Sequence, residues 1–202
     1  MSSIIYNGHE IQDLIINGNH AQLWLNGQKL YPTEEPGPSI ESVTIGSQTW
    51  MSKNLAIDDG QGGIYTQTVD YGQGDVVEYY YDWDAAVRVA ATVQGWHLPS
   101  SDEWDALANA VGGTSVAGTK LKSTYGWDYG NGTDDFGFAA FPAGLCISGS
   151  FRDVGSSANF WTATELLASS ASERSFGSGA LMDSKPDYKL DGHSVRLVKD
   201  SE

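Results

Sequence analysis

Carboxylates in recognisable motifs are the residues of this chain that offer the clearest chemistry. Asp134 and Asp135 stand side by side, and Glu165 lies in a later aromatic segment. Paired carboxylates can hydrolyse a glycosidic bond or hold a calcium ion. However, Asp134 and Asp135 end a short glycine-containing run that begins at Asn131, where such side chains usually bond the backbone of a turn. We therefore predict a turn and no catalytic residue here, with calcium as the alternative.

Histidine and cysteine give no local pattern for a metal site or a nucleophile. The four histidines, His9, His20, His97 and His193, lack the spacing of zinc ligands along the chain. We expect His97 to be a hydrogen-bonded structural residue. Cys146 is the single cysteine, so an internal disulfide and a thiolate metal cluster are excluded. We expect it to be a small buried side chain, and we predict no bound metal, no other cofactor and no enzymatic activity.

Two helices are predicted in the middle of the chain, where they would position these residues. Residues 82–94 place apolar side chains on one helical face, and Asp82 can cap the start of that helix. The second helix opens at Ser100 with Glu103 three residues later, which is the pattern of a capping box. Its apolar stripe ends at the glycine pair 112–113.

Short strands are predicted on both sides of these helices. Residues 43–45 and 48–51 form a hairpin turned by Gly46-Ser47. Residues 58–75 are predicted to be irregular, because glycine and polar residues dominate there. Later strands are expected at residues 136–141, 160–164, 174–176 and 194–198. With 7 Trp and 24 Gly in 202 residues, the composition indicates an α+β domain of short elements and tight turns around aromatic anchors.

Several motifs follow one another between residues 43 and 198. They are Val43-Thr44-Ile45-Gly46, Tyr81-Asp82-Trp83-Asp84, Gly95-Trp96-His97-Leu98-Pro99, Leu121-Lys122-Ser123, Gly130-Asn131-Gly132-Thr133, Phe160-Trp161-Thr162 and Ser194-Val195-Arg196-Leu197-Val198. In this order they make the segment resemble the Fibrobacter succinogenes major paralogous domain, a family similar to the C-type-lectin-like and formylglycine-generating-enzyme-like folds. The resemblance implies a C-type-lectin-like domain with two helices and short antiparallel strands, in which the last strand returns beside the first.

The related formylglycine-generating enzymes make a cofactor-dependent oxidase the alternative from a different functional class. Those enzymes use cysteine chemistry, so the alternative requires Cys146 to be exposed, acidic and close to a metal. Because the chain offers no second thiol, we expect the enzymatic activity of those relatives to be absent.

A separate unit is predicted at the start of the chain. Residues 1–32 contain the hairpin signals Asn7-Gly8, Asn17-Gly18 and Asn26-Gly27, each between apolar runs. Hairpins this small bury little surface, so we expect an attachment or assembly unit that packs on a neighbour or on copies of itself, a trimer being suited to a tail fibre. The alternative is a hairpin unit folded onto the main domain. The prolines and glycine of residues 33–40 predict a linker, followed by a ligand-binding domain at 41–202.

The charge and hydropathy of the chain limit its partners. The net charge of −15 opposes binding to nucleic acid or to an anionic membrane surface. No apolar run reaches the roughly 20 residues of a membrane helix, and the first residues lack the features of a secretory signal peptide. We therefore predict a protein that leaves the cell by another route, such as in a virion, or an extracellular surface protein whose signal was removed, without insertion into a membrane.

The segment from Leu145 to Asp191 mixes small polar and isolated apolar residues without a helical or strand period. Such a stretch suits a surface that presents side chains to a partner, here a cell-surface protein or glycan. The alternative is a flexible loop without a ligand. The residues expected to face the ligand are Ile147, Phe151, Asp153, Asn159, Leu166, Leu167, Arg174, Phe176, Leu181 and Asp183.

This mixed composition, placed between recognisable family motifs, resembles the variable proteins of diversity-generating retroelements, which use C-type-lectin-like folds for binding. The resemblance implies a non-enzymatic receptor-binding protein, associated with the tail of a gut phage and diversified by a retroelement. The alternative in the same functional class is a cell-surface adhesin or carbohydrate-binding module of a Bacteroidetes-type bacterium.

Overall fold

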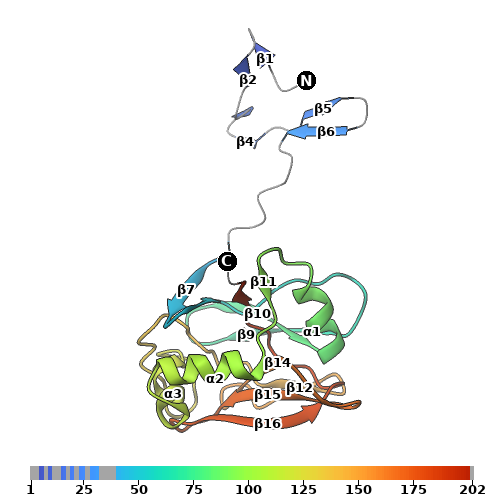
Figure 1. The fold of residues 1–202 in the computed structure, drawn as a ribbon. Helices are drawn as coiled ribbons and strands as arrows, with labels where there is room; N and C mark the ends of the chain where they lie inside the picture. Colours follow the sequence, from blue (N-terminus) through green and yellow to red (C-terminus); the bar gives the residue numbers. More distant parts are fainter. Residues whose placement is uncertain are drawn as a thin grey trace. The chain divides into compact units, whose positions relative to one another are not determined.

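The computed structural model describes residues 40–200 and six short strands between residues 5 and 31. The chain divides into two compact units, Met1–Ser39 and Ile40–Glu202, and Figure 1 gives the labels of their elements. The first unit contains the antiparallel pairs β1 (Ile5–Tyr6) with β2 (His9–Glu10), β3 (Ile15–Ile16) with β4 (Asn19–His20), and β5 (Leu23–Leu25) with β6 (Gln28–Tyr31).

The three strand pairs confirm the hairpins predicted in the first unit. Each pair flanks one of the Asn-Gly dipeptides, which are the residues that tight two-residue hairpin turns favour. The predicted linker lies outside the described residues, apart from Ile40. The role of residues 1–32 in attachment or assembly stays a prediction.

The second unit is an α+β domain, as predicted. Its helices are α1 (Trp83–Ala90), α2 (Ser101–Ala110) and α3 (Thr114–Leu121). Asp82 caps α1 by accepting from the backbone N–H of Ala85, and the Ser100–Glu103 capping box opens α2, so both predicted helix starts are confirmed. None of the helices in the described part of the chain is long and apolar enough to cross a membrane.

The prediction of two helices was wrong, because α3 follows directly after α2. The glycine pair at 112–113 has φ values of 111° and 101° and turns the chain between the two helices. Gly118 lowers the helix propensity of the segment, yet a Cβ there would lie 2.7 Å from the carbonyl oxygen of Ala180. Close backbone packing therefore requires this glycine, and packing stabilises a helix that the local sequence does not favour.

A four-stranded sheet brings the two ends of the domain together. It contains β7 (Ser42–Ile45), β8 (Gln48–Met51), β11 (Trp96–His97) and β17 (Val198–Lys199), in the order β11-β17-β8-β7. The predicted hairpin at the start of the domain is therefore confirmed. Of the last strand predicted at residues 194–198, only Val198 lies in β17, so that prediction was largely wrong. Val198 pairs with Trp50 of β8, and not with β7 as expected.

Residues 58–75, predicted to be irregular, contribute to a long antiparallel hairpin. β9 (Ile64–Asp70) pairs along its whole length with β10 (Asp75–Tyr81). The glycines on both sides of β9 obscured a run of β-branched and aromatic residues that suits a half-buried strand.

A three-stranded sheet occupies the segment expected to be an irregular binding surface. It contains β14 (Ala158–Leu167), β15 (Ser170–Phe176) and β16 (Met182–Tyr188), preceded by the small hairpin β12 (Leu145–Ile147) and β13 (Ser150–Arg152). Helices α2 and α3 pack against this sheet (Figure 1). The predicted strands at 160–164 and 174–176 lie within β14 and β15, which confirms them. Residues 136–141 form only a bridge at Ala140, so that strand prediction was wrong.

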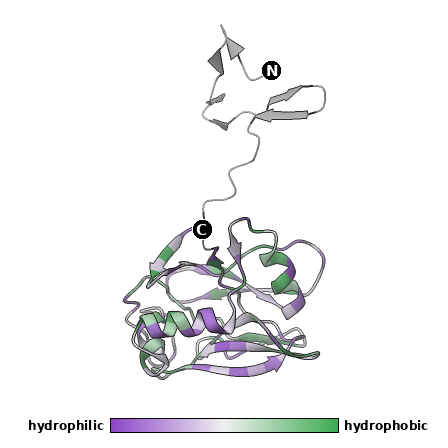
Figure 2. Cartoon of the chain, in the orientation of Figure 1, coloured by the Kyte–Doolittle hydropathy of each residue, from purple (hydrophilic) through white to green (hydrophobic). Residues whose placement is uncertain are grey.

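Strand β15 shows why the sequence suggested a loop there. All seven of its residues are buried, although Figure 2 colours much of β15 and β16 as hydrophilic. A central strand covered on both faces needs no alternation of polar and apolar residues, and its serines and Ala171 are small enough for close packing.

Aromatic residues fill two core clusters on opposite sides of β14. Consecutive strand residues point to opposite faces, so Phe160 enters one cluster and Trp161 the other. The ring centroid of Phe160 lies 5.4 Å from that of Trp104, which in turn lies 4.9 Å from Trp50. The sheets and helices are therefore joined through aromatic contacts rather than disulfides.

His97 links α2 to the end of the domain, which confirms its structural role. Its Nε2 atom lies 2.7 Å from Glu103 Oε1, and its Nδ1 atom lies 2.6 Å from Asp200 Oδ1. Burial alone would lower the pKa of His97, but these two carboxylates outweigh it and leave the pKa raised.

The raised pKa of His97 predicts a stability that decreases at higher pH. The folded state binds the imidazole proton more tightly than the unfolded state, so the contribution is complete below the unfolded pKa of about 6.5. It is lost as the pH rises through the higher folded pKa. We expect His97→Gln to flatten the pH dependence of urea unfolding in this range. An unchanged pH profile in the variant would contradict the assigned ion pairs.

Candidate functional site

The residues predicted to face a ligand do not form one surface. Leu166 and Leu167 lie at the β14–β15 turn, whereas Leu181 and Asp183 lie beside the other end of β15. All four are exposed, as is Asp153, while Ile147 and Phe151 on the β12–β13 hairpin are half-buried.

Three of the predicted ligand-facing residues are buried, so their assignment to the surface was wrong. Phe176 packs on Phe160 in the core, with ring centroids 6.1 Å apart. Asn159 donates to the carbonyl oxygen of Gly144 and to Ser157 Oγ, at 3.1 and 2.8 Å. These contacts hold the connection to β12 in place and leave Asn159 unavailable to a partner.

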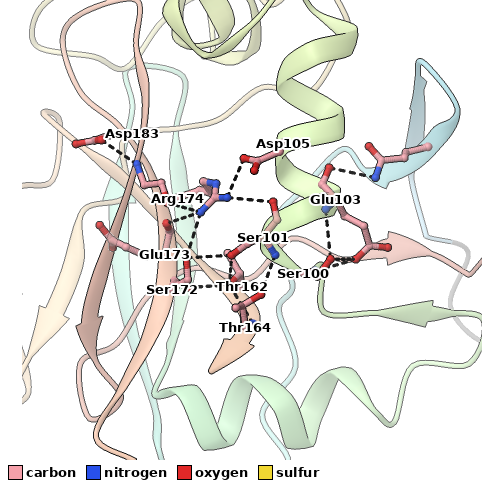
Figure 3. A network of polar contacts seen from close by, with 12 residues as sticks. Ser100, Ser101, Glu103, Asp105, Thr162, Thr164, Ser172, Glu173, Arg174 and Asp183 are labelled. Atoms are coloured by element: carbon pink, nitrogen blue, oxygen red, sulfur yellow. Dashed lines mark hydrogen bonds and ion pairs between the residues drawn. The ribbon is translucent and has the colours of Figure 1, made fainter. Parts of the chain in front are cut away.

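Arg174 is buried because it joins β15 to α2. Its Nη2 atom donates to the Ser101 carbonyl oxygen at 3.0 Å and to Asp105 Oδ1 at 2.9 Å. Its Nη1 atom donates to the hydroxyls of Ser172 and Ser184. Figure 3 shows the guanidinium directed at Ser101 and Asp105 of α2. The role of Arg174 is therefore to fix the helix on the sheet.

The expectations for the single thiol and for the Asp134 turn are confirmed. Cys146 is buried, and burial raises the pKa of its thiol, which is the opposite of what a nucleophile needs. Asp134 Oδ1 accepts from the backbone N–H of Ala139 at 2.8 Å, so this carboxylate holds a turn as predicted. Whether calcium binds there stays a prediction.

A pocket of about 330 Å³ lies elsewhere, between the β9–β10 hairpin, residues 52–56 and the loop around residues 125–141. Its walls include Tyr71, Tyr125 and Phe141. The ring centroid of Phe141 lies 4.9 Å from that of Tyr71 and 5.0 Å from that of Tyr125. Val76 and Val77 of the hairpin add exposed apolar side chains to the lining. The pocket thus has a continuous aromatic wall with an apolar strand beside it.

A buried polar network lies among the pocket residues. Glu78 is 5% exposed and accepts from Asn54 Nδ2 at 3.1 Å and from the Tyr71 hydroxyl at 3.2 Å. Arg196 Nη2 donates to Asn54 Oδ1 at 2.7 Å. Burial raises the pKa of the Tyr71 hydroxyl, with the charge of Glu78 acting in the same direction. Tyr71 therefore stays protonated and available as a donor to the carboxylate.

Arg196 is the cation of this network. Burial lowers its pKa to about 9, although the charges of Glu78 and Asp134 oppose that change. The side chain also donates to the carbonyl oxygens of Met51 and Phe138, and its guanidinium lies 4.5 Å from the ring centroid of Phe138. Arg196 therefore holds the pocket residue Asn54 and carries a charge opposite to that of Glu78.

The comparison with known families covers the pocket and both core clusters. The family model described as the Fibrobacter succinogenes major domain matches residues 43–199. The chain belongs to this family. Membership in the Fibrobacter succinogenes major domain family confirms the resemblance inferred from the order of the motifs. No curated protein and no solved structure matches the chain.

The pocket is the part of the site that sequence reasoning missed. Its residues come from segments that the sequence indicated to be framework or irregular, and they meet only after folding. The one available signal was the density of tyrosines, since Tyr71, Tyr79, Tyr80 and Tyr81 fall within a short stretch. Tyr71 and Tyr79 line the pocket.

Proposed function

We propose that residues 40–200 form a ligand-binding domain without catalytic activity, and that its pocket holds part of a glycan. The observation that carries this proposal is the aromatic wall beside a buried set of hydrogen-bonding groups. Aromatic faces pack against the CH groups of a sugar ring, and carboxylate oxygens accept from its hydroxyls. Pockets of roughly 300–1,000 Å³ hold small ligands. A volume of about 330 Å³ suits one or two sugar rings.

The charge balance of the pocket favours a neutral ligand over a cation. Glu78 is negative and Arg196 is positive, and Asn54 bridges them by hydrogen bonds. A carboxylate has about four acceptor positions, and Glu78 uses two of them for Asn54 and Tyr71. Acceptor capacity therefore remains for hydroxyl donors, while the nearby guanidinium opposes an ammonium group.

The wider setting is part of this proposal and is supported by the family membership and by the sequence. We propose a C-type-lectin-like scaffold, which agrees with the short antiparallel strands of the domain. The buried Cys146 supports recognition over an oxidase activity. On this proposal the protein is a receptor-binding protein of a phage tail or a surface adhesin, and residues 1–32 provide assembly into a homo-oligomer. The binding of several copies to one surface would increase avidity.

Tyr125→Ala is expected to weaken glycan binding at least about tenfold, because a stacking contact near 1.4 kcal/mol would be lost. The measurement is fluorescence on an array of bacterial and mucin-type glycans, followed by titration calorimetry with the best saccharide. Tyr129→Ala is the matched control, since Tyr129 belongs to the same loop and is 78% exposed. Absence of saccharide binding, or equal weakening by both variants, would contradict the proposal.

A second candidate is recognition of a protein at the end of the three-stranded sheet. Leu167 of β14 and Tyr188 of β16 are both exposed, and both pair with Ser170 of the strand between them. The two side chains therefore lie on one face of the sheet. Leu190 follows them and is 80% exposed. This end keeps Leu166 and Leu167 of the predicted ligand-facing set, and it is where retroelement-directed variation would act. Binding that survives Tyr125→Ala but is lost in Leu167→Ser would favour this candidate.

A further inference from the structure

Three ionisable residues meet in the interior beside β15 and β16. Glu173 lies on β15, Asp187 lies on β16, and His193 forms a backbone bridge with Tyr81. Ala171 pairs with Asp187 in the strand register, so Glu173 and Asp187 are diagonal neighbours on one face of the sheet. The side chains of Glu173 and His193 are fully buried, and that of Asp187 is 21% exposed. Asp187 therefore gives the cluster its route to solvent.

The contacts within this cluster are close but lack hydrogen-bond geometry. His193 Nδ1 lies 3.1 Å from Glu173 Oε2, and His193 Nε2 lies 3.1 Å from Asp187 Oδ2. Both nitrogens of His193 and Oε2 of Glu173 are buried without a hydrogen-bond partner among the described residues, whereas Glu173 Oε1 has an ion pair with Lys185 Nζ at 3.1 Å. Such groups are costly to leave unsatisfied in a protein interior. The cluster therefore lacks a component that would satisfy them.

Only one ring nitrogen of His193 can ligate a zinc ion, so only one of the two 3.1 Å contacts can be a spacing between neighbouring ligand atoms. In a tetrahedral zinc site with bonds near 2.0–2.1 Å, neighbouring ligand atoms lie about 3.3 Å apart and do not point at one another. Here one ring nitrogen and one oxygen from each carboxylate all lie within 4.8 Å of one another. Because 4.8 Å exceeds the spacing of about 3.3 Å in a tetrahedral site, the carboxylates would have to move toward a shared ion.

We propose that Glu173, Asp187 and His193 bind a single zinc ion. Imidazole nitrogen and carboxylate oxygen are both ordinary zinc ligands. Three protein ligands leave a fourth position for water, on the side where Asp187 reaches solvent. The ion would join β15, β16 and the bridge at His193. It would therefore link the three-stranded sheet to the core cluster that contains Trp161.

The surroundings of the cluster hold His193 in place and include a competing cation. The Trp161 ring packs against His193 with centroids 4.2 Å apart and an interplanar angle of 68°. Lys185 Nζ lies 3.1 Å from Glu173 Oε1, but the side chain of Lys185 is 53% exposed. Lys185 is therefore a competing cation that can move into solvent when zinc binds. The alternative occupant is a proton that turns His193 into an imidazolium between the two carboxylates.

Titration calorimetry of the full chain with zinc chloride, after dialysis against a chelator, tests this site. We expect one ion per chain in the variant His9→Gln/His20→Gln, which removes the histidines of the first unit. Asp187→Asn should weaken zinc binding at least about tenfold, as is usual when a residue that ligates the metal or orients its ligands is replaced. Lys185→Ala should strengthen it, because the competing cation is gone. Asp183→Asn, on the exposed part of the same strand, should have no effect.

The visible absorption of bound Co²⁺ provides a second measurement that does not rely on calorimetry. Co²⁺ in a tetrahedral site absorbs visible light much more strongly than aqueous Co²⁺, so the signal should appear in the wild type and be lost in Glu173→Gln. Absence of zinc binding in the wild type would overturn the proposal and leave the imidazolium cluster as the explanation. Zinc binding that survives both Asp187→Asn and Glu173→Gln would also overturn it.

Discussion

Replacing Trp104 by alanine is expected to lower the free energy of unfolding by about 3–5 kcal/mol, the usual range for deletion of a core aromatic side chain. The indole is fully buried, and its ring lies against those of Trp50, Phe138 and Phe160. The cavity left by the indole would remove the aromatic contacts that join α2 to β14 and to the four-stranded sheet that contains β8. Urea denaturation followed by circular dichroism measures the change.

Two further variants make the Trp104 experiment specific. The Nε1 atom of Trp104 is buried without a hydrogen-bond partner, so Trp104→Phe removes an unsatisfied donor and should cost much less than the alanine variant. Tyr129→Ala deletes an exposed aromatic ring and should change the free energy of unfolding by less than about 0.5 kcal/mol. A loss below about 1 kcal/mol for Trp104→Ala would show that the core relaxes around the cavity.

Arg196→Met is expected to destabilise the domain by about 3–5 kcal/mol, because it removes a buried cation that is linked to the buried Glu78 through Asn54. Glu78 would keep its buried charge without the nearby cation, and the carbonyl oxygens of Met51 and Phe138 would lose their donor. The same variant should abolish glycan binding, since Asn54 would no longer be held against Glu78. Chemical denaturation and the glycan array measure the two effects separately.

Arg88→Met is the matched control for Arg196→Met. Arg88 pairs with Asp59 at 2.7 Å. This pair is only partly buried, with 32% of the Arg88 side chain and 15% of the Asp59 side chain exposed, so the free energy of unfolding should fall clearly less than in Arg196→Met. Equal destabilisation by the two variants would mean that burial of Arg196 is not the source of its effect.

Local signals predicted the elements whose stability depends on neighbouring residues in the chain. The Ser100–Glu103 capping box and the Asp82 cap bond backbone groups within one helical turn, so their residue types were sufficient. The Asn-Gly dipeptides likewise specify tight turns through their own backbone preferences. The α+β class and the family membership followed from such signals and from the order of the motifs.

The candidate sites could not be predicted in this way. Asn54, Glu78 and Arg196 are far apart in sequence and meet through the packing of three segments. His193 lacks a local zinc spacing because its partners, Glu173 and Asp187, belong to two paired strands. Spacing along the chain detects ligands that share one helix or turn, and neither site is built on such an element.

The sequence by itself determined the turns at the Asn-Gly dipeptides and at Gly46-Ser47, where α1 and α2 begin, and which family the domain belongs to. Only the tertiary structure decided which polar residues are buried, and this reversed the assignment of Asn159, Arg174 and Phe176. It also stabilised α3 and β15 against weak local preferences. The physical reason is that caps and turns are satisfied by adjacent residues, whereas burial depends on what covers a residue from elsewhere in the chain.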